Sequence, residues 1–302
     1  MTQATAQPRR HQATLALDAR ATLGECIRWD ERQKLIYWVD IPGRQLHRYD
    51  PATGRDDAMP LAQEMGCFAL AERGGFICGM RSGYARLDRF GGEFTSLASP
   101  DYDPARARFN DGRCDSAGRF WAGTMWEPRD RAGGIVYRLD ADGRFGAQCN
   151  PVIIANGITF APDGRSMTLA DTTNHVLWAF DYDLVTGIPS SRRELRSYEP
   201  ASGRPDGACV DAEGNVYVAI MAGGRVEKIS PTGELLALIE LPIPNITCCT
   251  FAGDDLRTLY ITTARTRMTD AELAAHPYAG GLFVWRLPDG DAPGIIEPRY
   301  AG

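Results

Sequence analysis

Lysine is scarce in this sequence of 302 residues, with only Lys34 and Lys228 among its 33 basic residues. Neither lysine follows a glycine, which excludes the phosphate-binding loop of P-loop nucleotide hydrolases. The 39 acidic residues outnumber the basic ones and give a formal charge of −6, without any basic block. A negative chain of this kind is poorly suited to nucleic acid or an anionic membrane surface, so we expect neither as a partner.

Long apolar runs are also absent, because proline, aspartate or arginine interrupts each one before it reaches the length of a membrane span. Arg9 and Arg10 lie near the N-terminus, but no apolar segment of a signal peptide follows them. No pair among the eight cysteines has C-x-x-C spacing, and most of them lie in apolar runs. These absences predict a cytoplasmic protein with free thiols, with a vicinal disulfide between Cys248 and Cys249 as the alternative.

A short apolar strand recurs along the chain, and successive copies begin 40, 44, 47, 49 and 43 positions apart. A strand repeat of 40 to 50 residues is typical of a β-propeller with about four strands in each blade. Six copies predict an all-β, six-bladed propeller, and the alternative is a β-sandwich with accidental spacing. The copies are IYWVD from Ile36, FICGM from Phe76, FWAGT from Phe120, MTLAD from Met167, VYVAI from Val216 and LYITT from Leu259.

The repeats also set the expected boundaries. We predict a flexible N-terminus over residues 1–12 and one propeller domain over residues 13–302. The segment Thr14–Leu17 precedes the first repeat, and pairing it with the last blade would cover an otherwise open sheet edge and close the ring. Only Thr269–His276 has the pattern of a helix, beginning with Thr269 and Asp270.

Four polar residues share one position in the repeat, eight residues before the turn that follows the innermost strand. Counting back from that turn leads to Glu25, Asn110, Asn156 and Asp206, whereas in the second and sixth repeats it leads near Cys67 and Thr247. Equivalent positions of a propeller converge on its axis. Two carboxylates and two amides would repel or remain unsatisfied there without a cation. The alternative is that Asn and Asp before glycine only make turns.

This set of donors predicts a metal ion bound through oxygen alone. Such ligands suit Ca²⁺, Mg²⁺ or Mn²⁺. The four histidines do not share the position, so a histidine-rich zinc site is not expected.

Several motifs in this order resemble the sugar-lactonase family of gluconolactonase, regucalcin (a senescence marker protein) and luciferin-regenerating enzyme. They include LGECIRW from Leu23, RFNDGR from Arg108, NGI from Asn156 and RPDG from Arg204. The resemblance runs from about residue 20 to 290 and implies a six-bladed propeller with one divalent metal. Ca²⁺ is the expected ion, with Mg²⁺, Mn²⁺, Zn²⁺ or Fe²⁺ as alternatives.

The resemblance also implies roles for individual residues. Glu25, Asn156 and Asp206 would hold the metal, Asp206 would also be the catalytic acid/base, and Arg108, Asn110 and Glu127 would contact the sugar lactone. The chain departs from the family in two places. Cys26-Ile27 follows Glu25 where the family usually has Gly-Pro, and Pro128 stands where regucalcin has its sugar-binding glutamate.

Lactone hydrolysis agrees with the predicted site. A divalent cation polarises the carbonyl, and the attacking water loses its proton to Asp206 or through coordination to the metal. No G-x-S-x-G nucleophile motif offers another route. We therefore expect a metal-dependent aldonolactonase acting on glucono-, xylono- or arabinono-lactone, as a monomer or weak homodimer. The alternatives are a calcium-binding propeller without turnover and an esterase on a non-sugar ester.

Overall fold

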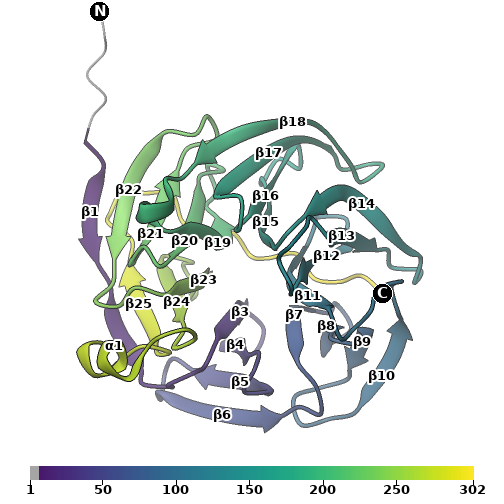
Figure 1. The fold of residues 1–302 in the computed structure, drawn as a ribbon, viewed down its shortest axis with the longest axis horizontal. Coiled ribbons are helices and arrows are strands. Elements are labelled where there is room, and N and C mark those ends of the chain that lie inside the picture. The colour runs from purple at the N-terminus through teal and green to yellow at the C-terminus, as the bar shows by residue number, and fades with distance from the viewer. Residues whose placement is uncertain (1–6) are drawn as a thin grey trace, which may run out of the picture.

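Six β-sheets surround one axis in the computed structural model, which describes residues 7–302 (Figure 1). The first blade contains β3 (Gly24–Asp30), β4 (Leu35–Asp40), β5 (Gln45–Asp50) and β6 (Arg55–Pro60). The second contains β7 (Met65–Leu70), β8 (Phe76–Met80), β9 (Gly83–Leu87) and β10 (Phe94–Ala98). The third contains β11 (Ala107–Cys114), β12 (Phe120–Trp126), β13 (Gly134–Leu139) and β14 (Phe145–Val152).

The remaining three blades follow the same antiparallel order. The fourth contains β15 (Ala155–Phe160), β16 (Ser166–Asp171), β17 (Val176–Asp183) and β18 (Ile188–Ser197). The fifth contains β19 (Arg204–Val210), β20 (Val216–Met221), β21 (Arg225–Ile229) and β22 (Leu235–Glu240). The sixth contains β23 (Ile246–Ala252), β24 (Thr258–Thr263), β25 (Leu282–Arg286) and, from the other end of the chain, β2 (Thr14–Leu17). The predicted all-β, six-bladed propeller is therefore confirmed.

The innermost strands β3, β7, β11, β15, β19 and β23 contact one another in turn, and β23 returns to contact β3. The core lies between neighbouring blades, because each sheet buries an apolar face against the next. Trp121 of β12, for example, packs 5.8 Å from the ring of Phe160 of β15. A propeller built in this way surrounds a channel whose two ends differ, since every inner strand runs in the same direction.

The N-terminal strands join blades that are distant in sequence. β2 pairs antiparallel with β25, as predicted for ring closure. The expected flexible N-terminus over residues 1–12 was wrong for part of its length, because β1 (Arg9–Gln12) pairs parallel with β22 and extends the fifth blade. Arg10 and Gln12 both bond the side chain of Glu240 there. Residues 1–6 of that prediction lie outside the described residues.

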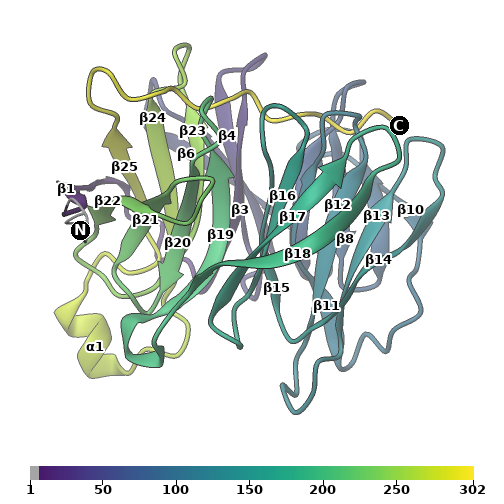
Figure 2. The ribbon, with the colours of Figure 1, turned by 90° about the horizontal axis from the view of Figure 1, so that it is seen from above.

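Two segments mark the two faces of the propeller. The helix α1 (Asp270–Ala275) follows β24, with Thr269 as its N-cap in a capping box, which confirms the predicted helix. The chain after β25 crosses the face opposite to α1 (Figure 2) and forms bridges to two blades, at Asp211 and at Ala71.

In residues 7–302, no helix is long and apolar enough to cross a membrane. All eight cysteines are free, so the vicinal disulfide is not formed.

Candidate active site

A cavity of about 340 Å³ opens at the end of the channel where the inner strands begin. It gathers every residue for which the sequence predicted a role. Those residues are Glu25, Arg108, Asn110, Glu127, Asn156 and Asp206. They come from the first, third, fourth and fifth blades, so only closure of the ring brings them together.

A β-bulge lies at the equivalent position of all six inner strands. The pairing register shifts between Glu25 and Arg28 in the first blade, and equivalent shifts occur in the other five. A bulge adds a residue to one strand and redirects the nearby side chains. In the second blade the bulge leaves Gly66 unpaired, where an added Cβ would lie 1.9 Å from the Phe109 carbonyl oxygen. The sixth blade has Thr247, whose hydroxyl donates to the Gly24 carbonyl.

The carboxylates of Glu25 and Asp206, at the bulges of the first and fifth blades, are buried beside other acids. Glu25 is 5% exposed and Asp206 is 6% exposed, and in residues 7–302 neither forms a salt bridge. Burial raises the pKa of both carboxyl groups, and the nearby charge of Asp111 raises both further. The Oδ1 atom of Asp206 is buried without a hydrogen-bond partner among the described residues. Such a pair is stable in its charged form only beside a positive charge.

The amide of Asn156 is held in a fixed orientation beside them. Its Nδ2 donates to the Thr172 hydroxyl at 2.8 Å, and its Oδ1 accepts from Asn110 Nδ2 at 2.8 Å. A carbonyl oxygen has two lone pairs, so Oδ1 keeps one acceptor position. Asn110 also accepts from Arg108 Nη1 at 2.9 Å, which uses both ends of its amide within the protein. Asn110 therefore links Arg108 to Asn156.

These residues fit a divalent cation. The orphaned Asp206 oxygen, the two repelling carboxylates and the oriented Asn156 oxygen form a hard, oxygen-only donor set. In the described part of the chain, no group of three or more His, Cys, Asp and Glu side chains could hold a metal. A site here therefore depends on an amide oxygen as a ligand, and Asn156 is placed to supply it.

The backbone next to Glu25 accommodates the departure from Gly-Pro. Cys26 adopts a left-handed conformation with φ of 48°, which favours glycine over other residues. Its amide donates to Glu25 Oε2 at 3.1 Å, and its thiol accepts from the Phe68 amide at 3.1 Å. Gly157 has φ of 55° directly after Asn156. The turn geometry beside two of the predicted ligands is thus similar.

Glu127 lies at the wall of the cavity in an ion-pair network. Arg81 donates to both of its carboxylate oxygens, at 3.0 and 2.8 Å, and this lowers the pKa of Glu127. Arg81 also pairs with Glu64, and Arg108 Nε lies 3.9 and 3.8 Å from Glu64 and Glu127. Two arginines and two glutamates therefore balance each other at this wall.

Sequence reasoning missed several residues of the cavity. The additional polar side chains include Glu64, Arg81, Arg129, Thr172, Thr173, Arg204, Thr266 and Arg267. All except Arg81 line the cavity directly. Most lie in loops that do not follow the repeat, so counting back from the repeated turn could not identify them. Arg204 belongs to the RPDG motif, two residues before Asp206, but the motif alone predicted no role for its side chain.

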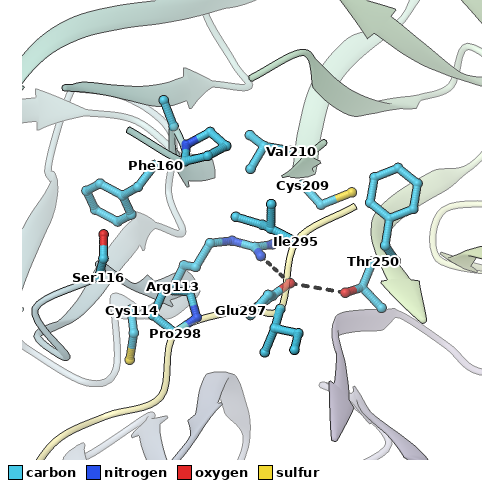
Figure 3. A pocket seen from close by; sticks show the side chains of 14 residues that line it. Arg113, Cys114, Ser116, Phe160, Cys209, Val210, Thr250, Ile295, Glu297 and Pro298 are labelled. Carbon is cyan, nitrogen blue, oxygen red and sulfur yellow. Dashed lines mark hydrogen bonds and ion pairs between the residues drawn. The ribbon is translucent and has the colours of Figure 1, made fainter. Parts of the chain in front are cut away.

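A second cavity of about 240 Å³ lies at the other end of the channel (Figure 3). It is lined by the ends of the inner strands and by the C-terminal segment, from which Glu297 points inward to Arg113. Glu297 also accepts from the Thr250 hydroxyl at 3.1 Å and lies 3.2 Å from Arg28 Nε. The Glu297 carboxylate is therefore fully used in ion pairs and a hydrogen bond within the protein at this end of the channel.

The structure defines a class of protein, the six-bladed propeller with oxygen donors at one end of its channel. Comparison with known proteins identifies the family within that class. The family described as SMP-30/Gluconolactonase/LRE-like region matches residues 23–265. The chain belongs to this family.

The similar proteins cover almost the whole chain. A 6-deoxy-6-sulfogluconolactonase from Pseudomonas putida is 44% identical over 93% of this chain and 96% of its own length. Regucalcin from Gallus gallus is 36% identical over 94% of this chain and 96% of its own length. The crystal structure of a calcium-binding protein, regucalcin, from Agrobacterium tumefaciens matches with a TM-score of 0.92 and 26% identity. That match covers 98% of this chain and 100% of that one.

Proposed function

We propose that this protein is a metal-dependent lactonase that opens a sugar lactone to its aldonic acid. The observation that carries the proposal is the buried pair Glu25 and Asp206 beside Asn156, at the bottom of an open polar cavity. Membership of the family supports it, as does similarity to a relative named for a sulfogluconolactone. Aldono-lactones such as glucono-, xylono- and arabinono-lactone are the substrates to test.

Glu25, Asn156 and Asp206 would hold the divalent ion, with Ca²⁺ as the first candidate because a solved structural relative is a calcium-binding protein. When bound, the ion would polarise the lactone carbonyl and stabilise the negative charge that develops on its oxygen. The binding of such an ion also relieves the repulsion between Glu25 and Asp206.

Asp206 is the proposed acid/base. Of its two carboxylate oxygens, the one that does not hold the ion can accept the proton of an attacking water molecule. The new bond joins the water oxygen to the carbonyl carbon, and the bond to the ring oxygen breaks. Asp206 then returns the proton to the departing ring oxygen, so the products are the open chain and a free carboxyl group.

The wall of the cavity positions the sugar. Arg108 and Glu127 have charged groups that hydrogen-bond sugar hydroxyls, and Glu64 and Arg81 hold Glu127 and Arg108 in place through ion pairs. Asn110 orients Arg108 and Asn156 at the same time. We therefore assign Asn110 to positioning, which refines its predicted role as a substrate contact.

Acid release from glucono-, xylono- and arabinono-lactone tests the proposal directly. Purified protein should release acid faster than the spontaneous rate, lose this activity with a chelator and regain it with one added divalent ion. Glu25→Gln should weaken metal binding at least as much as the roughly 10- to 100-fold that losing an outer-shell partner costs. Glu194→Gln is the matched control, because Glu194 is exposed on β18 and makes no side-chain bond in the described residues.

The outcomes separate the alternatives. Metal binding without turnover of any lactone would support a calcium-binding propeller. Turnover of simple phenyl esters alone would support an esterase. Full activity after exhaustive chelation would contradict the metal dependence.

A further inference from the structure

Three arginines stand around the proposed lactone cavity and take no part in its ion-pair network. Arg129 lies in the loop after β12, Arg204 begins β19, and Arg267 lies in the loop after β24. They therefore come from the third, fifth and sixth blades and meet only because the ring is closed. All three line the cavity that a substrate would enter.

None of the three has an acidic partner within ion-pair distance among the described residues. In residues 7–302, Arg129, Arg204 and Arg267 form no salt bridge and no side-chain hydrogen bond, in contrast to Arg108 of the same cavity and to Arg81 beside it. The Nε atom of Arg204 is buried without any hydrogen-bond partner. Leaving a buried donor of a charged group unsatisfied destabilises the protein, because the donor has lost its hydrogen bonds to water. An arrangement of this kind is stabilised when an acceptor arrives.

The like charges also act on one another. Burial lowers the pKa of the Arg129 guanidinium, and the positive charges of Arg267 and Arg204 lower it further. Two of the three, Arg129 and Arg267, have left-handed backbones with φ of 58° and 61°. Strained conformations and repelling charges of this kind are costs that functional sites commonly retain.

A charge balance of the cavity leaves these arginines in excess. Glu64 and Glu127 are matched by Arg81 and Arg108, and Glu25 and Asp206 would be matched by a divalent ion. With that ion bound, the remaining three arginines would give the cavity a net positive charge in a chain whose formal charge is −6. A neutral sugar lactone offers only hydroxyl, ring and carbonyl oxygens and would leave this charge uncompensated.

We propose that Arg129, Arg204 and Arg267 form an anion-binding subsite that selects sugar lactones with a negatively charged substituent. The substituent is a sulfonate, phosphate or carboxylate on the carbon at the far end of the sugar from the ester. Guanidinium groups present paired N–H donors that match the oxygens of such anions. This inference rests on the proposed lactonase function, because the anion would orient the same substrate that the metal site opens.

The test compares kcat/KM for glucono-1,5-lactone with kcat/KM for its analogues carrying a sulfonate, a phosphate or a carboxylate at C6. The wild-type protein should prefer at least one anionic analogue, and the three arms identify which group the subsite takes. Arg129→Gln and Arg267→Gln should each lower the ratio of anionic to neutral kcat/KM about tenfold or more, since one charged hydrogen bond contributes at least that much. Raised salt should lower the same ratio.

The control variant is Arg165→Gln. Arg165 is an exposed arginine of the turn between β15 and β16, at the other end of the channel, and it has no side-chain bond in the described residues. It should leave the ratio unchanged. Equal losses on neutral and anionic lactones in the Arg129 and Arg267 variants would overturn the subsite while leaving the lactonase proposal intact.

A binding measurement decides the inference even if no lactone is hydrolysed. In calorimetric titration, 6-phosphogluconate and the C6 sulfonate and carboxylate analogues of gluconate should each be compared with gluconate. At least one should bind about tenfold more tightly than gluconate, and Arg129→Gln should remove that difference. If gluconate binds as tightly as all three and loses its affinity in the same variant, the cluster recognises the product carboxylate and the proposed subsite is wrong.

Discussion

Single residues at the β-bulges determine which side chains reach the channel. Cys26 carries a left-handed backbone that costs a non-glycine residue about 1–2 kcal/mol. Its thiol bonds to the amide and carbonyl of Phe68 in the next blade offset part of that cost. The conformation is useful because the Cys26 amide donates to Glu25 and fixes its carboxylate. The strained backbone of Cys26 therefore orients the carboxylate of Glu25, the proposed metal ligand.

The Asp206→Asn variant tests the two roles proposed for this residue. It keeps the side-chain shape and one oxygen but loses the charge and the basicity. With metal at saturation, we expect kcat to fall about 10²–10⁴-fold, the usual contribution of a general base. Steady-state kinetics over a range of metal concentrations provides the measurement, with the exposed Asp289→Asn as control. Full recovery of kcat by excess metal would reduce Asp206 to a ligand.

The raised pKa values of Glu25 and Asp206 predict how the metal-free protein responds to pH. A carboxyl group whose pKa is higher in the folded than in the unfolded state makes stability fall as the pH rises from about 4 through the folded pKa. We therefore expect the chelated protein to lose melting temperature over this range, and added metal to restore more of it at high pH. Thermal melts of the wild type and the Glu25→Gln/Asp206→Asn variant provide the test. The same slope in both would disprove this origin.

At the scale of elements, the two N-terminal strands connect the ends of the chain differently. β2 supplies the outer strand of the sixth blade and covers the edge of β25, whereas β1 only extends a fifth blade that already has four strands. β1 is also largely exposed, and its contacts to Asp291 and Glu240 are surface ion pairs of small energetic value. Ring closure therefore depends on β2.

Two N-terminal deletions separate these contributions. Removing residues 1–17 should lower the melting temperature by about 5 °C or more, since it opens a sheet edge and breaks ladder hydrogen bonds worth a few kcal/mol. Removing residues 1–12 keeps β2 and should cost clearly less. Differential scanning calorimetry of both proteins is the measurement. An unchanged melting temperature in the longer deletion would show that the ring closes without β2.

Across the whole molecule, buried charges tie the C-terminal segment to the blades. Arg28 of β3 and Arg113 of β11 are 2% and 6% exposed, and both pair with Glu297. Arg28 also donates to the Gly112 carbonyl at 2.5 Å, and Arg113 donates to the Ala208 carbonyl at 2.5 Å. Burial alone would raise the pKa of Glu297, but Arg113 and Arg28 hold it below its ordinary value. The network joins three blades to the chain end.

Glu297→Gln should destabilise the protein by about 3–5 kcal/mol, because it leaves two buried guanidinium groups without a counter-charge. Urea unfolding measures the change, and Glu234→Gln, at an exposed turn without side-chain partners in the described residues, is the control. The Glu297 contribution is present above its unfolded pKa and is lost as the pH falls through its folded pKa. A loss below about 1 kcal/mol would show that the network adds little.

The sequence by itself determined the features that repeat. Strand and turn residues recur about every 45 positions, so blade number, the equivalent positions of Glu25, Asn110, Asn156 and Asp206 in the inner strands, and ring closure by Thr14–Leu17 were all predictable. Neighbouring residues encode these features, because side-chain alternation and turn chemistry act over a few positions. The helix at Asp270–Ala275 was predictable for the same reason, through its Thr269 cap.

Only the tertiary structure decided the features that depend on side chains far apart in the chain. The short, polar β1 has no strand pattern and is paired through Glu240. Glu64 meets Arg81 and Arg108 from another loop, and Glu297 reaches Arg113 from the chain end. The cluster of Arg129, Arg204 and Arg267 likewise joins three blades. Loop residues do not follow the repeat, and ion pairs form between residues that are distant in the sequence. Closure of the ring therefore determines these contacts, and no local sequence pattern predicts them.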